Sequence, residues 1–186
     1  MANRNTQGFG LIAAGTLGQT PATSGQGKYK IDAGSTTTIY NGAAVASSAG
    51  YIIDGQTTDA PILGVLNGIF YNAATTLKPT FSNHYVQVTP ANSEDIDAFV
   101  FDNPQQQYVV ATDAAVAQSG YLETYDMNTS AGSDTTGQSS ATLDIADTSA
   151  DAASFRLLRS AEDPENDENA ARRSVVVCIN LIELQS

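Results

Sequence analysis

The sequence predicts an all-β fold, a single β-sandwich or barrel-like domain. Short apolar runs recur along the chain and are separated by turn dipeptides such as Asn41-Gly42 and Asp54-Gly55. Almost no segment has the apolar spacing of a helix, and Ser, Thr, Ala, Gly, Asn and Gln fill long stretches between the runs. Strands at this spacing are typical of sandwiches and barrels. The length of 186 residues fits one compact domain.

An extended N-terminal arm is expected over residues 1–30, ahead of a β-rich domain over residues 31–186. The arm is rich in glycine and polar residues, so it has few side chains to bury. Its apolar side chains could anchor on the rest of the domain or on another subunit, and a flexible tail is an equally open interpretation. The candidate contact residues are Phe9, Leu11, Ile12 and Leu17.

The first half of the domain is expected to contain four strands. Residues 36–40 are β-branched and aromatic, and residues 43–53 form a second strand with a possible break near 47–50. Residues 61–71 are a long apolar strand, in which Gly64 and Gly68 indicate a bulge or a close backbone approach. Alternation predicts a short, half-exposed strand over 84–89.

The middle of the chain predicts a hairpin, a short helical segment and further strands. Two apolar runs, 96–102 and 107–112, flank a turn that contains Pro104, which is typical of a β-hairpin. An Ala-rich stretch over 113–118 could form one or two helical turns with Thr112 as the N-cap. Strands are then expected over 121–127 and 142–146, with a polar loop over 128–139 between them.

The last part of the chain predicts two strands around an acidic, Asn-rich loop. The final strand is apolar on both faces, so it should be central in its sheet or covered by another subunit. Cys178 within it should be a small buried hydrophobe, and a single cysteine excludes an intrachain disulfide. One face carries Val175, Val177, Ile179 and Leu181, and the other carries Val176, Cys178 and Ile182.

The charge balance argues against several classes of partner. Eight Lys and Arg stand against 20 Asp and Glu, which gives a net charge of −12 that repels nucleic acid and anionic membrane surfaces. Neither a signal peptide nor a membrane span is expected. We therefore expect synthesis in a cytoplasm and no direct contact with nucleic acid or membrane.

The sequence contains few candidates for catalytic or metal-binding residues. His84 is the only histidine, which excludes a multi-histidine metal site. The acidic loop does not match the calcium loop of an EF-hand, and no phosphate-binding glycine loop is present. Glu94, Asp95 and Asp97 could be paired carboxylates for glycoside chemistry, but the chain has no Trp for sugar stacking. We therefore expect no enzyme activity, no catalytic residues, no small-molecule substrate, no cofactor and no metal. The acidic residues of the loop are Asp163, Glu165, Asp167 and Glu168.

Five segments spread over nearly the whole chain carry a resemblance to a known family. They are Ala-Asn-Arg-Asn-Thr-Gln-Gly-Phe-Gly-Leu at 2–11, Ile-Leu-Gly-Val-Leu-Asn-Gly-Ile-Phe-Tyr at 62–71, Ala-Phe-Val-Phe-Asp-Asn-Pro at 98–104, Phe-Arg-Leu-Leu-Arg at 155–159 and Val-Val-Cys-Ile-Asn at 176–180. Together these segments resemble the head decoration, or cement, proteins of tailed bacteriophages. The family's ending usually continues Asn-Xaa-His, whereas Asn180 here is followed by Leu181 and Ile182, so no role of that histidine is carried over.

The resemblance implies a structural protein on the outer surface of an icosahedral virion. It implies a homotrimer that binds the major capsid protein and stabilises contacts between capsid subunits, after synthesis in the cytoplasm of a host bacterium. Under this interpretation, deleting residues 2–20 should leave the β-domain folded and weaken capsid binding. The alternative is a carbohydrate- or host-binding β-sandwich on the virion, of the fibre or adhesin type, and the missing Trp counts against it.

Overall fold

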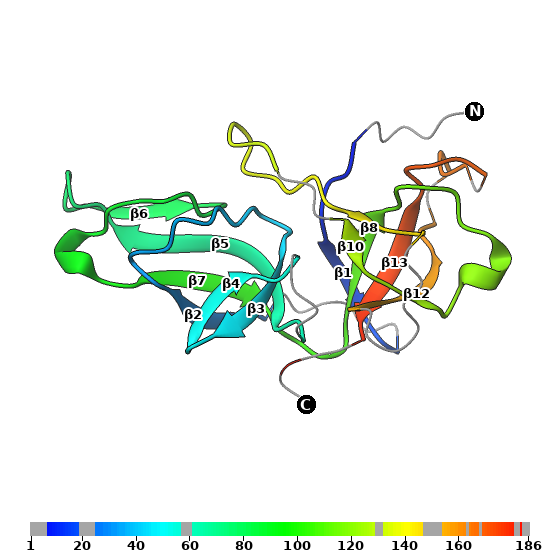
Figure 1. Cartoon of the computed structure of the whole chain (residues 1–186), viewed down its shortest axis with the longest axis horizontal. Helices are drawn as coiled ribbons and strands as arrows, with labels where there is room; N and C mark the ends of the chain where they lie inside the picture. The colour runs from blue at the N-terminus through cyan, green and yellow to red at the C-terminus, as the bar shows by residue number, and fades with distance from the viewer. Residues whose placement is uncertain are drawn as a thin grey trace.

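The computed structural model shows an all-β protein whose described strands form two larger antiparallel sheets and a two-stranded ribbon, which confirms the expected fold class. Figure 1 shows the sheets side by side along the long axis of the molecule. The structure describes residues 7–18, 25–56, 61–128, 132–146, 154–162, 164–167, 169–180 and 183.

The strands of the described residues fall into three groups. The five-stranded sheet has the order β1 (Ile12–Thr16), β8 (Gln106–Ala111), β13 (Ser174–Ile179), β12 (Phe155–Ser160) and β9 (Thr124–Tyr125). The six-stranded sheet has the order β2 (Gly27–Ile31), β7 (Ile96–Phe101), β5 (Gly64–Asn72), β3 (Ala44–Ser48) and β4 (Tyr51–Asp54), and β6 (Pro79–Ser82) pairs with β5. A small ribbon joins β10 (Met127–Asn128) to β11 (Thr142–Leu143). The described part of the chain also contains two short 3-10 helices, η1 (Ala91–Ser93) and η2 (Gln118–Gly120).

Turn and bulge residues lie where the sequence predicted them. Gly42 has a φ of 79°, and the N–H of Ala43 donates to the carbonyl of Tyr40 at 3.0 Å, which closes the turn before β3. The expected break near 47–50 is a hairpin turn between β3 and β4, in which Ala49 and Gly50 both have positive φ. In β5 the register shifts between Leu66 and Gly68, as expected for a bulge.

The prediction that β7 and β8 form a hairpin is wrong. β7 pairs with β2 and β5 in the six-stranded sheet, whereas β8 pairs with β1 and β13 in the five-stranded sheet. The turn between them is closed by Gln106 N–H donating to Asn103 O at 2.9 Å, and it carries the chain from one sheet to the other. The alternation of apolar and polar residues predicts a strand but does not predict which strand it pairs with. Two strands joined by a short turn can therefore belong to different sheets.

Three other local predictions fail. Residues 36–40 and 84–89 form no strand, and one isolated bridge joins Ile39 to Tyr85. These segments each place one large side chain in the core and leave most of their other side chains partly or fully exposed. Residues 113–117 are not helical, and the short helix η2 follows them. Thr112 is bridged to Leu143 instead of capping a helix.

The closing strand is central in its sheet, as predicted. β13 lies between β8 and β12, and all six of its residues are buried. Cys178 is buried, and burial raises the pKa of its thiol. Leu181 and Ile182 lie outside the described residues. Apolar residues on both faces of this segment therefore correctly predicted a central strand.

Among the residues that the structure describes, two hydrophobic clusters form the core, and β3 and β5 contribute to both. Ala44 and Val65 belong to the cluster between the two sheets, which also contains side chains of β8, β12 and β13. Their neighbours Val45 and Leu66 belong to the second cluster, beneath the six-stranded sheet. Adjacent residues of a strand point to opposite faces, so β3 and β5 each have one face in the first cluster and the other face in the second.

Candidate functional site

The candidate contact residues of the N-terminal segment are divided between the core and the surface. Leu11 is 3 % exposed and belongs to the cluster between the sheets, and Phe9 is half-buried. Ile12 is 49 % exposed and Leu17 is 42 % exposed. Two of the four residues are therefore available to a partner on the surface of the folded chain.

Hydrogen bonds attach this segment to the body of the same chain. The N–H of Leu11 donates to the carbonyl of Gly42 at 2.8 Å. The side-chain amide of Gln138 donates to Phe9 O at 2.9 Å, and that of Gln106 donates to Gly15 O at 2.8 Å. Residues 12–16 thus form β1 at the edge of the five-stranded sheet, and the proposed boundary at residue 30 falls inside β2.

A cleft of about 360 Å³ lies beside β1. Its lining combines apolar side chains with side-chain amides and contains no ionisable group, so it suits an apolar or main-chain group better than a proton-transfer reaction. The residues that line it include Phe9, Ile12, Asn41, Asn67, Phe101 and Gln138.

One face of the six-stranded sheet carries one exposed aromatic ring and two half-buried ones. Phe81 is 65 % exposed, and its ring centroid lies 6.2 Å from that of Phe99. A Cβ at Gly68 would come within 2.8 Å of the Phe81 ring, so the glycine makes room for that ring over β5. We call this surface the aromatic face; it consists of Phe70, Phe81, Phe99, Lys28, Lys30 and Asp97.

Register places these six side chains on one surface. Lys28 is opposite Phe99, Lys30 is opposite Asp97, and Phe70 is opposite both Asp97 and Phe81 on its two neighbouring strands. The sequence analysis missed this surface because its rings come from three strands. One local signal was present: in β7 the residues at both alternating sets of positions are largely apolar.

Glu94, Asp95 and Asp97 are brought together around a depression of about 280 Å³, but not as a catalytic pair. Asp97 forms ion pairs with Lys28 at 2.7 Å and with Lys30 at 2.6 Å. Burial opposes ionisation of Asp97, but the hydrogen bonds from both lysines outweigh it and lower its pKa. A glycosidase acid needs a raised pKa, so Asp97 is suited to an ion pair and not to proton donation.

His84 is held by packing and a hydrogen bond. Its ring stacks on Tyr40 with centroids 6.0 Å apart, and Nδ1 lies 2.8 Å from Asn83 Oδ1. The hydroxyl of Tyr40 donates to Asp134 at 2.6 Å, which ties the 132–139 loop to this ring pair. The prediction of a polar loop over 128–139 did not anticipate this contact between Asp134 and Tyr40. The stacking on Tyr40 and the contact with Asn83 favour a structural role for the His84 ring.

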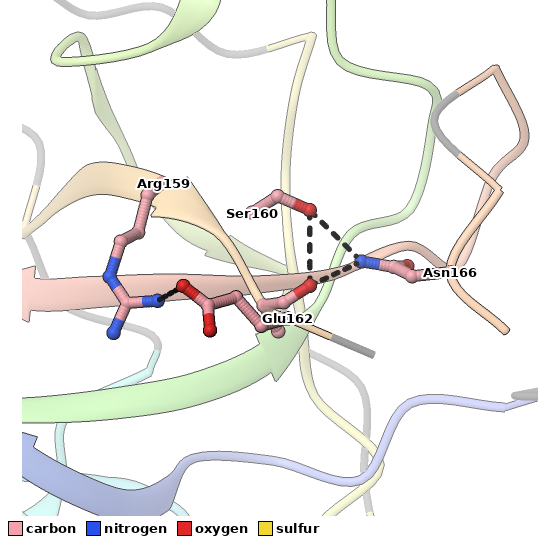
Figure 2. Close-up of polar contacts among 5 residues, drawn as sticks. Arg159, Ser160, Glu162 and Asn166 are labelled. Carbon is pink, nitrogen blue, oxygen red and sulfur yellow. Dashed lines mark hydrogen bonds and ion pairs between the residues drawn. The ribbon is translucent and has the colours of Figure 1, made fainter. Parts of the chain in front are cut away.

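The acidic loop between β12 and β13 is organised by the side chain of Asn166 (Figure 2). Its Nδ2 donates to Ser174 O at 2.8 Å, Ser160 Oγ at 3.1 Å and Ala161 O at 3.2 Å. Its Oδ1 accepts from Ser174 N–H at 2.9 Å. Arg159 and Glu162 form an exposed ion pair at 3.8 Å, also drawn in Figure 2.

This network closes the loop on its own backbone. Asp163 and Glu168 lie outside the described residues. Within the described ranges, no three His, Cys, Asp or Glu side chains are placed to hold a metal ion. The same part of the chain contains no helix long and apolar enough to cross a membrane.

Comparison with known proteins found no similar protein: no family, no curated protein and no solved structure matches the chain.

Proposed function

We propose that the chain is a capsid decoration protein of a tailed bacteriophage, which binds the outer surface of the icosahedral head and stabilises contacts between major capsid proteins. The observation that carries the proposal is the pair of exposed apolar side chains on the N-terminal segment, Ile12 and Leu17. This segment follows directly on one of the stretches that resemble the cement family. Exposed apolar side chains at a sheet edge favour contact with another protein.

The contacts of a decoration protein need not be strong individually. Many copies bound to a symmetric shell give stability by avidity, and a trimer multiplies the contacts of each bound unit. A net charge of −12 suits a protein that surrounds packed DNA without binding it. The geometry of His84 and of the carboxylates around Lys30 supports a structural role over catalysis.

Surface variants test the proposal better than deletion of residues 2–20. Such a deletion removes Leu11 from the core and uncovers β8, so it would destabilise the fold as well as remove a contact. The double variant Ile12→Thr, Leu17→Ser changes two exposed side chains on the same segment. Leu122→Asn is the matched control, because Leu122 is 62 % exposed and lies at a distant turn with a φ of 68°, which Asn tolerates.

The measurement is co-sedimentation of each purified protein with empty, expanded capsids that lack it, together with light scattering for the oligomeric state. We expect stoichiometric binding and a trimer for the parent chain, weaker binding for the double variant, and parent-like binding for Leu122→Asn. A parent chain that stays monomeric, ignores capsids and binds a glycan array would favour the adhesin alternative instead.

A further inference from the structure

The 132–139 loop, which lies between β10 and β11, extends toward the six-stranded sheet (Figure 1). The N–H of Asn41 donates to Gly137 O at 2.9 Å, and the N–H of Ser139 donates to Asn41 O at 2.9 Å. The hydroxyl of Tyr40 adds the bond at 2.6 Å to the same loop. Asn41 belongs to the turn that precedes β3, so these bonds attach the loop to the six-stranded sheet.

The same loop and the turn it pairs with also hold the stretch of chain just before β1. The side-chain amide of Gln138 donates to Phe9 O at 2.9 Å, and the N–H of Leu11 donates to Gly42 O at 2.8 Å. Gly10 has a φ of 71°, and a Cβ there would lie 2.8 Å from Gly42 O, so a glycine is needed for this close approach. The chain is therefore fixed on both sides of Gly10 before it enters β1.

This fixation matters for Ile12, the first residue of β1. Ile12 is opposite Val109 in β8, but the register of the pairing shifts between Ala13 and Thr16, so the regular ladder at this end of β1 is short. The ends of strands fray where few ladder bonds hold them. Since the side chain of Ile12 is 49 % exposed, its position depends on how firmly the backbone at this end is held.

Leu17, at the other end of β1, is held by different groups. Its N–H donates to Gln105 O at 2.9 Å, and the side chain of Gln106 donates to Gly15 O at 2.8 Å. Both bonds come from the residues where β8 begins and not from the 132–139 loop. A change in the loop should therefore loosen Ile12 and leave Leu17 in place.

We propose that Gln138 is a positioning residue for capsid binding: through its bond to Phe9 it orders the start of β1, so that Ile12 is presented to the capsid in a fixed position. This inference rests on the proposed function and names what orders one of its contact residues. A segment that is already ordered loses less conformational entropy when it binds. Gln138 itself is half-buried in the wall of the cleft beside β1, so we expect it to act through Ile12 and not by touching the capsid.

The first test is a co-sedimentation titration of the full chain with empty, expanded capsids. Gln138→Ala removes the bond to Phe9 O, and we expect it to weaken binding by about fivefold, the effect of one neutral hydrogen bond. In an Ile12→Thr background Gln138→Ala should weaken binding little further, whereas in a Leu17→Ser background it should weaken binding as much as in the parent chain. Gln56→Ala is the matched control, because Gln56 is also half-buried and lies after β4, and it should bind like the parent chain.

The second test is amide hydrogen exchange of the free chain. In Gln138→Ala the amide of Leu11 should exchange about fivefold faster, because the segment opens locally more often. The amides of β13, the central strand, should exchange at the parent rate. A purely structural role of Gln138 would speed exchange in both places. Gln138→Glu keeps the size of the side chain and loses the donor, so it decides both tests if Gln138→Ala fails to fold.

The outcomes separate this inference from the proposed function. If the parent chain binds capsids and Gln138→Ala binds with parent affinity, the positioning role is wrong and the decoration function stands. The same conclusion follows if Gln138→Ala weakens binding equally in the Ile12→Thr background, or if exchange becomes faster throughout the chain. If the parent chain does not bind capsids, the function itself is overturned and this inference with it.

Discussion

The network around Asn166 leads to a prediction about the stability of the β12–β13 loop. Asn166→Asp keeps the shape of the side chain but replaces its donor group with an acceptor. The bonds to Ser174 O and Ala161 O, at 2.8 and 3.2 Å, are lost, while the bond accepted from Ser174 N–H can persist. Two hydrogen bonds at about 1 kcal/mol each give a loss of about 2 kcal/mol. For a chain of this size the melting temperature should fall by about 4–8 °C.

The effect should also depend on pH. A carboxylate facing two carbonyl oxygens is disfavoured in the folded state, so folding raises the pKa of the introduced Asp above its unfolded value of about 3.9. Stability is then lost as pH rises above about 4, and the deficit shrinks below that pH because a protonated acid can donate to Ser174 O.

The assay is urea unfolding followed by circular dichroism at a series of pH values. Asn169→Asp is the control, since it adds the same charge to the same loop at an exposed position. Equal stability of the two variants at neutral pH would refute the role given to Asn166.

Three further predictions concern the core and its ionisable groups. Leu11→Ala should cost about 2–4 kcal/mol in urea unfolding, because Leu11 is 3 % exposed in the cluster between the sheets; a neutral result would mean that the segment does not pack there. Burial, the 2.7 Å hydrogen bond to Asp102 and its charge raise the pKa of Tyr29 to about 12, so the unfolded chain ionises first. Stability should therefore fall as pH rises from 10 to 12, less steeply in Tyr29→Phe, and parallel curves would count against the Tyr29 pairing. Cys178 should react slowly with a thiol reagent in the native state and rapidly in denaturant, and equal rates would contradict its burial.

The sequence correctly predicted those features of the fold that depend on the conformational preferences of a few adjacent residues. The turns at Gly42 and Gly50 and the bulge before Gly68 follow from backbone conformations that glycine adopts easily. The position of β13 follows from its two apolar faces. These features depend on a few adjacent residues, so alternation and turn dipeptides were sufficient to find them.

Pairings between distant segments could not be predicted in this way. β7 and β8 are joined by a short turn, yet their partners lie up to 97 residues away (Ile12 opposite Val109), so a hairpin within one sheet was the simpler prediction. The same limit hid the aromatic face, because Phe70, Phe81 and Phe99 meet only once β5, β6 and β7 are paired. For the N-terminal segment the sequence did not show which of the four candidate contact residues the core would bury.

The switch between sheets at β7–β8 has a consequence for the order of events on the ribosome. The six-stranded sheet is built from β2 to β7, so all its strands are available once residue 101 has left the exit tunnel. The five-stranded sheet needs β1 from the start of the chain and β13, which inserts between β8 and β12 after residue 174. β1 must therefore wait for most of translation before its sheet can close. A chain released before residue 174 would lack β13, the middle strand of the five-stranded sheet. This sheet can therefore fold only after residue 174 has been synthesised.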